Sequence, residues 1–141
     1  MKVSSKGIKA IEQREGSRKG AYRDSRGLLT IGVGHLSDEY FRVHPGMIIS
    51  EAKVLELLAH DLGEVEDVIN KKVQVPLQQW QFDAMASLGF NIGAGGLAHS
   101  SVVHFVNLKM FMQAADAFMA WCHPAVLRTR RESERRQFLG A

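Results

Sequence analysis

The chain has 141 residues, of which 45% are hydrophobic, and a formal net charge of +3. This length is enough for one globular domain that buries roughly two thirds of its unfolded surface, and the single cysteine excludes a disulfide scaffold. No apolar run approaches the ~20 residues of a membrane span, the polar start lacks a signal-peptide core, and no zinc-binding pattern of histidine and cysteine occurs. We therefore expect no stable membrane insertion, no export signal, no metal and no cofactor.

The first predicted element is a helix over residues 5–15. Ile8, Ile11 and Glu15 recur at spacings of three and four, which is typical of one helix face, and Gly16 suits a left-handed C-cap. Glu15 should therefore extend an apolar face in the last turn, where burial and the negative end of the helix dipole both raise the pKa of its carboxyl. A carboxyl that stays protonated near neutral pH can act as a general acid. The alternative is an ordinary solvated glutamate paired with lysine or arginine.

The residues that follow predict a β-hairpin. A turn signal at 24–27 precedes apolar residues that alternate with threonine and glycine over 29–34, as in a strand with one buried face. In this register Tyr22 pairs with Thr30. The side chains of Asp24 and Thr30 then lie diagonally on one face, within reach of a shared water. The structural alternative for Asp24 is an Asx turn.

The remaining elements are mostly helical. Residues 36–49 predict a loop or short strand, and Ser50 should cap a long helix that ends near residue 72. Further helical patterns cover roughly 78–90, 99–107, 112–122 and 125–139. The predicted fold class is α+β, mostly helical with one small sheet.

One motif joins the first helix to the hairpin. Asp24 follows Glu15 by nine residues and Thr30 follows Asp24 by six, within Glu15-Gly16 and a 30–35 segment that reads Thr-Ile-Gly-Val-Gly-His. A Phe-Asn-Ile-Gly segment at 90–93 and an arginine-rich end complete the pattern. With these motifs, nearly the whole chain resembles the phage-type lysozymes, glycoside hydrolase family 24.

The resemblance implies a lysozyme-like fold and a cell-wall activity. It implies one catalytic domain over residues 1–141, with a sheet lobe at about 16–50, a connecting helix at about 50–72, and a helical lobe at about 73–141 that includes the N-terminal helix. The implied reaction is hydrolysis, with inversion, of the β-1,4 bond between N-acetylmuramic acid and N-acetylglucosamine in peptidoglycan.

The resemblance also assigns catalytic roles. Glu15 would protonate the leaving oxygen, while Asp24, with Thr30 beside it, would hold or activate the attacking water. Inversion predicts that the carboxyl groups of Glu15 and Asp24 lie roughly 6.5–9.5 Å apart, which leaves room for that water.

Other positions are candidates for substrate contact or support. The candidate substrate contacts are Gly34, His35, Leu36 and Asn91. His35 should pair with Asp61 and thereby hold the sheet to the long helix, with substrate contact as the alternative. Asn91 either hydrogen-bonds a substrate acetamido group or caps its helix.

The arginine-rich end has two interpretations. By resemblance, Arg131 or Arg130 should contact Glu15. Alternatively, charges spaced four apart form a solvated, self-paired helix face, which accounts for most of this segment.

The expected partners follow from the implied reaction. They are peptidoglycan strands, with release from the host cytoplasm through a separate holin and action as a monomer. The rival activities are a lytic transglycosylase and a wall-binding module without hydrolysis. Nucleic-acid binding is disfavoured because glutamates interrupt the basic run.

Overall fold

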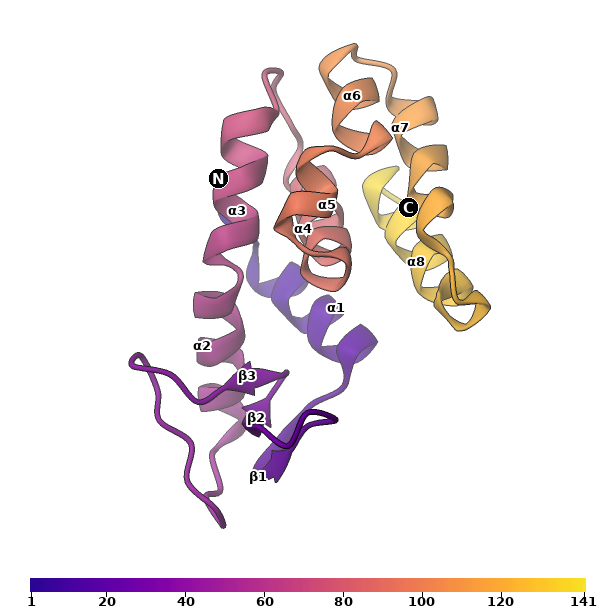
Figure 1. Ribbon diagram of the computed structural model, residues 1–141. Helices are drawn as coiled ribbons and strands as arrows, with labels where there is room; N and C mark the ends of the chain where they lie inside the picture. The colour runs from indigo at the N-terminus through magenta and orange to yellow at the C-terminus, as the bar shows by residue number, and fades with distance from the viewer. The chain divides into compact units, whose positions relative to one another are not determined.

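The computed structural model describes residues 1–141, which divide into two compact units. The sheet unit is Ile8–Asp61, and the helical unit is Met1–Gly7 together with Leu62–Ala141. Figure 1 shows the three strands in the first and most helices in the second. No helix combines the length and the apolar character that crossing a membrane requires.

Helix α1, Ser5–Glu15, has the predicted bounds. It ends at Gly16, whose φ is 79° and whose N–H donates to the Glu12 carbonyl at 2.8 Å, so the predicted left-handed C-cap is confirmed. Ile11 is fully buried. The expected burial of Glu15 is wrong, because its side chain is exposed. The helix ends at Gly16, so Glu15 lies in its last turn.

The sheet has three antiparallel strands in the order β1-β2-β3. They are β1 Arg18–Arg23, β2 Leu29–Gly32 and β3 His35–Leu36. Tyr22 pairs with Thr30, which confirms the predicted hairpin register. The predicted alternation to residue 34 overextends the second strand, because Gly32 and Gly34 have φ values of 67° and 68° and turn the chain into β3.

Helix α2, Glu51–Asp61, completes the sheet unit. Ser50 Oγ accepts a hydrogen bond from Lys53 N at 3.1 Å, so this residue is the predicted cap. Ile31, Val43 and Leu57 form the buried core. The sheet, the following loop and α2 thus share one hydrophobic cluster.

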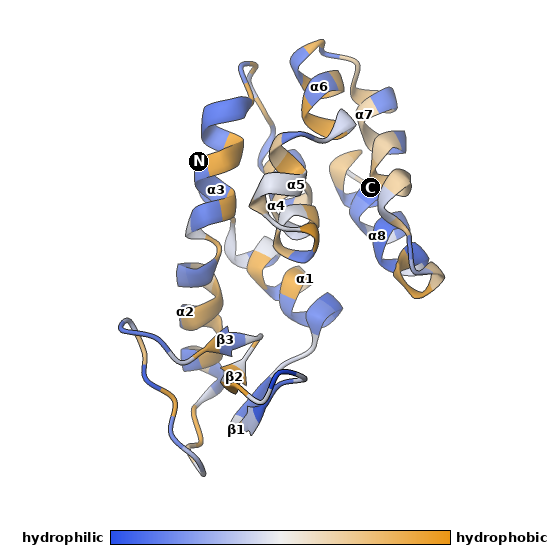
Figure 2. Ribbon diagram, in the orientation of Figure 1, coloured by the Kyte–Doolittle hydropathy of each residue, from blue (hydrophilic) through white to orange (hydrophobic).

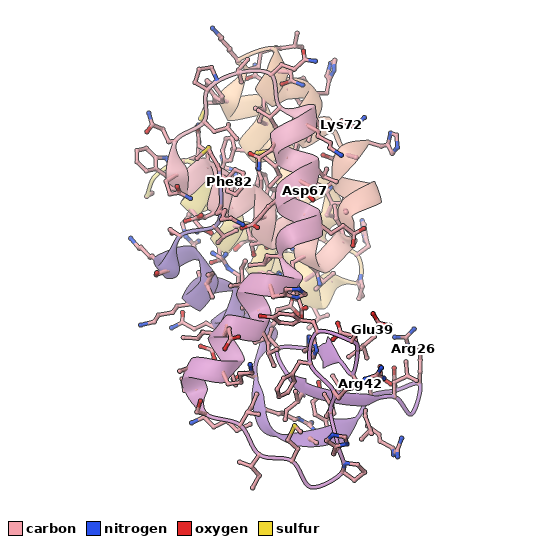
Figure 3. All side chains as sticks on the ribbon, turned by 90° about the vertical axis from the view of Figure 1, so that its left-hand side faces the viewer. Arg26, Glu39, Arg42, Asp67, Lys72 and Phe82 are labelled. Carbon is pink, nitrogen blue, oxygen red and sulfur yellow. The ribbon has the colours of Figure 1, made fainter.

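The predicted single helix to about residue 72 is instead two helices. Helix α3, Gly63–Lys72, begins after Leu62, whose ψ of −9° departs from α-helical geometry. The interruption falls beside Gly63, a residue of low helix propensity. Asp67 and Lys72 of α3 are exposed, whereas Phe82 of the next helix is fully buried; Figure 3 labels all three.

Helix α4, Gln79–Ile92, is the most buried element of the helical unit. Every residue over 82–89 is buried. The helix packs against α8, Arg128–Phe138. Figure 2 shows the contrast between the two, since α4 contains many apolar residues and α8 is largely hydrophilic. A buried face on so polar a helix requires paired charges.

The other helices of this unit are short. They are α5 Ala94–Ala98, α6 Ser101–Asn107, α7 Phe111–Ala117 and two 3₁₀ turns at Phe118–Trp121 and Ala125–Leu127. The sequence patterns predicted α6 and α7 approximately and missed α5.

Candidate active site

Asp24 occupies the hairpin turn. Its Oδ1 accepts hydrogen bonds from Arg26 N at 2.8 Å and Leu28 N at 2.9 Å, which is the Asx-turn alternative. The hydrogen bond from Leu28 N, followed by the bond and charge of Arg26, lowers the pKa of the Asp24 carboxyl. Its Oδ2 lies 3.7 Å from Arg26 Nη2 and accepts neither backbone bond. The turn therefore holds an ionised carboxylate through one oxygen only.

Thr30 lies next to this turn on β2. Its side chain is 1% exposed, and its Oγ1 donates to the Leu28 carbonyl at 2.8 Å. Because the hydroxyl proton is committed to that carbonyl, Oγ1 can only accept a further hydrogen bond. Asp24 and Thr30 are thus held by the N–H and the C=O of the same residue, Leu28.

Glu12 is a second carboxyl of α1, and burial affects it. Burial first, and then the hydrogen bond and charge of Glu51, raise the pKa of Glu12, while Ser17 and Lys19 oppose the shift. Glu12 Oε2 is a buried side-chain oxygen without a hydrogen-bond partner. The sequence signal was present, because Glu12 follows Ile8 by four residues and so shares its helix face.

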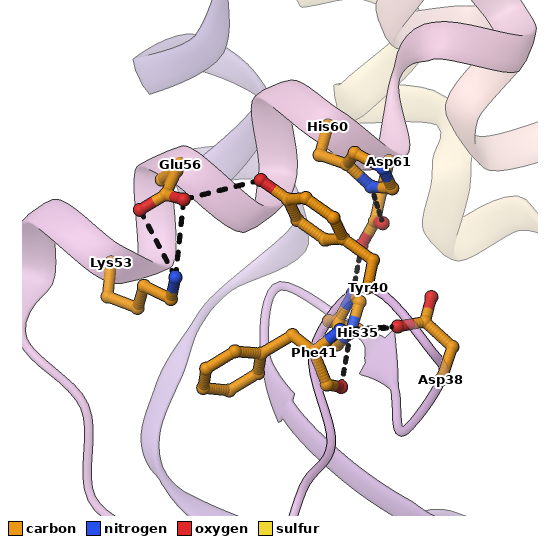
Figure 4. Close-up of polar contacts among 8 residues, drawn as sticks. All are labelled: His35, Asp38, Tyr40, Phe41, Lys53, Glu56, His60 and Asp61. Atoms are coloured by element: carbon orange, nitrogen blue, oxygen red, sulfur yellow. Dashed lines mark hydrogen bonds and ion pairs between the residues drawn. The ribbon is translucent and has the colours of Figure 1, made fainter.

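His35 is a buried structural residue, 2% exposed. Its Nδ1 lies 2.8 Å from Asp61 Oδ2, so the predicted pairing is confirmed (Figure 4). Its Nε2 lies 3.2 Å from the Phe41 carbonyl oxygen and 3.3 Å from Asp38 Oδ1. Both ring nitrogens have partners within the protein. These contacts match the expected structural role of His35 and not the alternative of substrate contact through the imidazole.

The same three side chains, His35, Asp38 and Asp61, are close enough together to be considered as metal ligands. However, the two carboxylates approach different nitrogens of the imidazole. This geometry is that of a histidine fixed by hydrogen bonds.

A polar cluster beside it, which the sequence analysis missed, belongs to the same unit. The Tyr40 ring stacks on His60 with centroids 3.5 Å apart, and its hydroxyl donates to Glu56 at 3.3 Å (Figure 4). Gly34 and Leu36, on either side of His35, are exposed and so remain accessible to a ligand.

Three further charged side chains lie in loops of the sheet unit. Glu39 and Arg42 are exposed in the loop after β3, and Arg26 is exposed in the hairpin turn (Figure 3). Neither Glu39 nor Arg42 makes a contact that organises the site, so both suit control substitutions.

The arginine-rich end contains a buried polar cluster in the helical unit. Arg131 and Glu134 are both fully buried, so the expected solvated face is wrong for these two residues. Glu134 accepts from Arg131 Nη1 at 2.6 Å, Ser87 Oγ at 2.5 Å and Arg130 Nε at 3.1 Å. The expected pairing on a solvated helix face is confirmed only for Arg128 and Glu132, whose Nε and Oε1 atoms lie 3.2 Å apart.

Asn91 joins this cluster through Arg131, whose Nη2 donates to Asn91 Oδ1. The C-cap alternative for Asn91 is wrong, because α4 continues to Ile92 and Gly93 is the cap, with φ of 95°. Glycine has no Cβ and adopts this conformation without strain, whereas asparagine would be less favourable there.

The fold and the site together define a class of protein. A small antiparallel sheet carries an ionised aspartate and a threonine, an exposed glutamate ends the preceding helix, and a mostly helical unit completes the chain. A pair of acidic residues in separate environments is typical of a glycosidase.

Comparison with known proteins identifies the family. The family model described as phage lysozyme matches residues 12–134. The endolysin of Salmonella phage P22 is 47% identical over 144 aligned residues, which cover 99% of each chain. A crystal structure of a P22 lysozyme mutant matches with a TM-score of 0.93 and 48% identity over 99% of each chain.

A second solved structure that matches this chain is described as a muramidase domain. The muramidase domain of SpmX from Asticaccaulis excentricus matches with a TM-score of 0.84 and 32% identity over 98% of this chain and 97% of that one. The chain belongs to the phage lysozyme family. Its fold is lysozyme-like and α+β, as predicted.

Proposed function

We propose that this chain is a muramidase that cleaves the β-1,4 bond between N-acetylmuramic acid and N-acetylglucosamine when a phage lyses its bacterial host. Membership of the phage lysozyme family and the 47% identity with an endolysin support a peptidoglycan-cleaving glycosidase. The description of a matched structure as a muramidase domain supports the choice of bond.

Glu15 is the general acid of the proposed reaction. Its exposed carboxyl at the end of α1 is accessible to a ligand, and it precedes the hairpin within the same unit. It would protonate the glycosidic oxygen as the bond to the anomeric carbon breaks.

In this proposal Asp24 and Thr30 hold the attacking water. The observation that carries it is that both side chains hydrogen-bond to the backbone of Leu28, Asp24 to its N–H and Thr30 to its carbonyl. Asp24 Oδ2 and Thr30 Oγ1 can both only accept hydrogen bonds, so together they can bind the two hydrogens of one water. The lone pair of that water is then free to attack the anomeric carbon. Asp24 takes the proton that the water loses, and the sugar configuration inverts.

Two substrate contacts are proposed in the sheet unit. Gly34 and Leu36 are exposed near the trio in sequence and are proposed to bind the glycan. In the helical unit, the amide of Asn91 is proposed as a further substrate contact. His35 and Asp61 position the strand and do not contact the sugar.

The test is digestion of purified peptidoglycan by the wild-type chain and by Glu15→Gln, with the new sugar ends identified by mass spectrometry. We expect reducing muramic acid ends from the wild type alone. Glu39→Gln, which neutralises an exposed glutamate in the same unit, should retain the wild-type yield.

Two other products would overturn the proposal. Ends of the 1,6-anhydro type would indicate a lytic transglycosylase, and intact glycan with free peptide termini would indicate a peptidase or amidase. Proton NMR of the first product also tests the mechanism, because inversion at a β bond produces the α anomer first.

The biological setting is part of the same proposal. The chain would act as a monomer, leave the host cytoplasm through a lesion made by a separate holin, and reach the wall without binding nucleic acid. Expression in a bacterium with and without a holin tests the route, and lysis of equal speed in both cultures would contradict it.

A further inference from the structure

The connection between α6 and α7 carries a group of exposed apolar side chains. Three of the large hydrophobic residues that the chain exposes fall within five positions: Leu108 at 54%, Met110 at 37% and Met112 at 55% exposure. Apolar residues scattered singly over a surface need no explanation, whereas a group of them marks an interaction site. We call these three residues the apolar cluster.

Backbone hydrogen bonds hold the cluster in place. Leu108 N donates to the His104 carbonyl at 3.3 Å, and Met110 N donates to the Phe105 carbonyl at 2.9 Å. Lys109, between them, has a φ of 58° and is the only non-glycine residue with a positive φ. Since a lysine keeps this conformation only where the surrounding structure imposes it, the connection is a turn of fixed shape.

Asn107 joins this turn to the end of α3. Its Nδ2 donates to the Lys72 carbonyl at 2.8 Å, and its Oδ1 accepts from Gln74 N at 2.7 Å. Figure 1 shows the connection between α6 and α7 and the loop after α3 at the same end of the helical unit. The exposed residues Lys71 and Lys72, the second of which Figure 3 labels, therefore belong to the same end as the apolar cluster.

This end of the helical unit is positively charged and poor in acidic residues. Residues 68–115 include Lys71, Lys72 and Lys109, all exposed, but only one acidic residue, Asp83. Asp83 is 4% exposed, and its Oδ1 accepts a hydrogen bond from Ser4 N at 3.0 Å. The single carboxylate of this segment is therefore buried and does not neutralise the surface.

Two acidic residues flank the segment without compensating its charge. Asp116 pairs with Arg135 at 2.9 Å. Asp67 precedes Lys72 by five positions, and helical side chains meet at spacings of three and four. Lys72 and Lys109 therefore carry the unbalanced positive charge beside the apolar cluster.

We propose that the apolar cluster, together with Lys72 and Lys109, is a docking surface for an anionic phospholipid bilayer. Leucine and methionine side chains can enter the boundary between headgroups and acyl chains, while lysines place their ammonium groups at the lipid phosphates. A glycan offers no acyl region for the apolar side chains, and a second copy of the chain would bring lysines against lysines. The association is peripheral, since no helix is long and apolar enough to cross a membrane. This inference goes beyond the proposed function and does not depend on it.

The test is co-sedimentation of the purified chain with vesicles of phosphatidylcholine alone and with vesicles that also contain phosphatidylglycerol. We expect binding to the mixed vesicles that weakens as salt is added, because salt screens the attraction between lysine and anionic lipid. The double variant Leu108→Gln, Met112→Gln should lower the partition constant by roughly tenfold, since two apolar side chains no longer enter the lipid.

Matched substitutions separate the surface from general effects. Val126→Gln changes a side chain that is 81% exposed in the 3₁₀ turn Ala125–Leu127 of the same unit, and it should leave the partition constant unchanged. Lys72→Gln should lower binding by roughly fivefold, the effect of one lysine near an anionic membrane. Lys6→Gln, at an exposed lysine in α1 of the same unit, should have a smaller effect.

The outcomes are distinguishable. Equal binding of the wild type to both kinds of vesicle, equal binding of the double variant and the wild type, or equal losses in Lys72→Gln and Lys6→Gln would overturn the inference. Sedimentation equilibrium tests the other occupant, because a wild-type dimer that the double variant does not form would assign the cluster to a second copy of the chain. No glycan is present in these measurements, so a chain that binds lipid but releases no reducing ends would contradict the proposed function alone.

Discussion

Asp24 uses its two carboxylate oxygens differently. Oδ1 closes the hairpin turn by accepting two backbone N–H bonds, and Oδ2 accepts neither of them. Because those bonds stabilise the ionised form, the pKa of Asp24 is lowered, and the group remains a base in weakly acidic solution. Activity that depends on ionised Asp24 should decline only as the pH falls through this lowered value.

Asp24→Asn tests that role. The amide can keep its oxygen in the turn, but it places a donor where Oδ2 would accept from water, so turnover should fall on the order of 100-fold or more. The release of reducing ends measures it. Asp38→Asn is the matched control, because Asp38 also accepts a backbone bond, from Phe41 N at 2.8 Å, and also has a lowered pKa. Equal losses in both variants would refute a special role for Asp24.

Thr30 gives a second residue-scale prediction. Thr30→Val matches the side chain in shape but has no acceptor for water, and the Leu28 carbonyl then keeps only its bond from Asp24 N, at 2.9 Å. We expect turnover to fall on the order of tenfold. Thr30→Ser restores the hydroxyl and should recover most of the activity at equal enzyme concentration. A Ser variant as inactive as the Val variant would mean that the methyl group matters and the hydroxyl does not.

At the scale of elements, local sequence predicted what local forces decide. The bounds of α1 and the register of the hairpin follow from spacing, a glycine cap and turn residues, which act over a few positions. Helix α5 was missed because it is five residues long and contains two glycines, so it has no usable periodicity. The interruption at Leu62 was missed because apolar spacing continues across it.

The cap of α1 can be tested directly. Gly16 has φ of 79°, and an added Cβ would meet no atom within 4 Å, so Gly16→Ala strains the backbone alone. The free energy of unfolding should fall by about 1 kcal/mol, equivalent to a loss of about 3 °C in Tm by thermal denaturation. Gly20→Ala is the control, because it also meets no atom but has no positive φ. Identical melting curves for the two variants would argue against a strained cap.

At the scale of the whole molecule, the two units differ in charge. The net charge of +3 belongs to the helical unit, with 10 basic and 7 acidic residues, while the sheet unit has 8 of each. Long-range attraction to an anionic cell wall therefore comes from the unit that does not carry the proposed trio.

Global stability should depend on pH through Glu12. Its raised pKa means that the folded chain binds this proton more tightly than the unfolded chain, so stability is lost as the pH rises from the ordinary glutamate value through the raised one. Glu12→Gln removes the penalty of a partly buried carboxylate beside Glu51. Its Tm should exceed that of the wild type at pH 7, and the difference should vanish below the ordinary pKa.

The control for this effect is Glu39→Gln, which neutralises an exposed glutamate in the same unit. Its Tm should follow that of the wild type at every pH. A constant offset between Glu12→Gln and the wild type across the pH range would show that the buried charge is not responsible.

The sequence by itself determined the fold class, the α1 helix, the hairpin register and the motif of Glu15, Asp24 and Thr30, because these depend on spacing along the chain and on the preferences of single residues. Only the tertiary structure decided which carboxyl of α1 is desolvated, that both nitrogens of His35 are occupied, and that Arg131 and Glu134 are buried around Asn91. Burial and hydrogen-bond partners arise where segments distant in sequence meet, and periodicity within one helix does not specify what covers it.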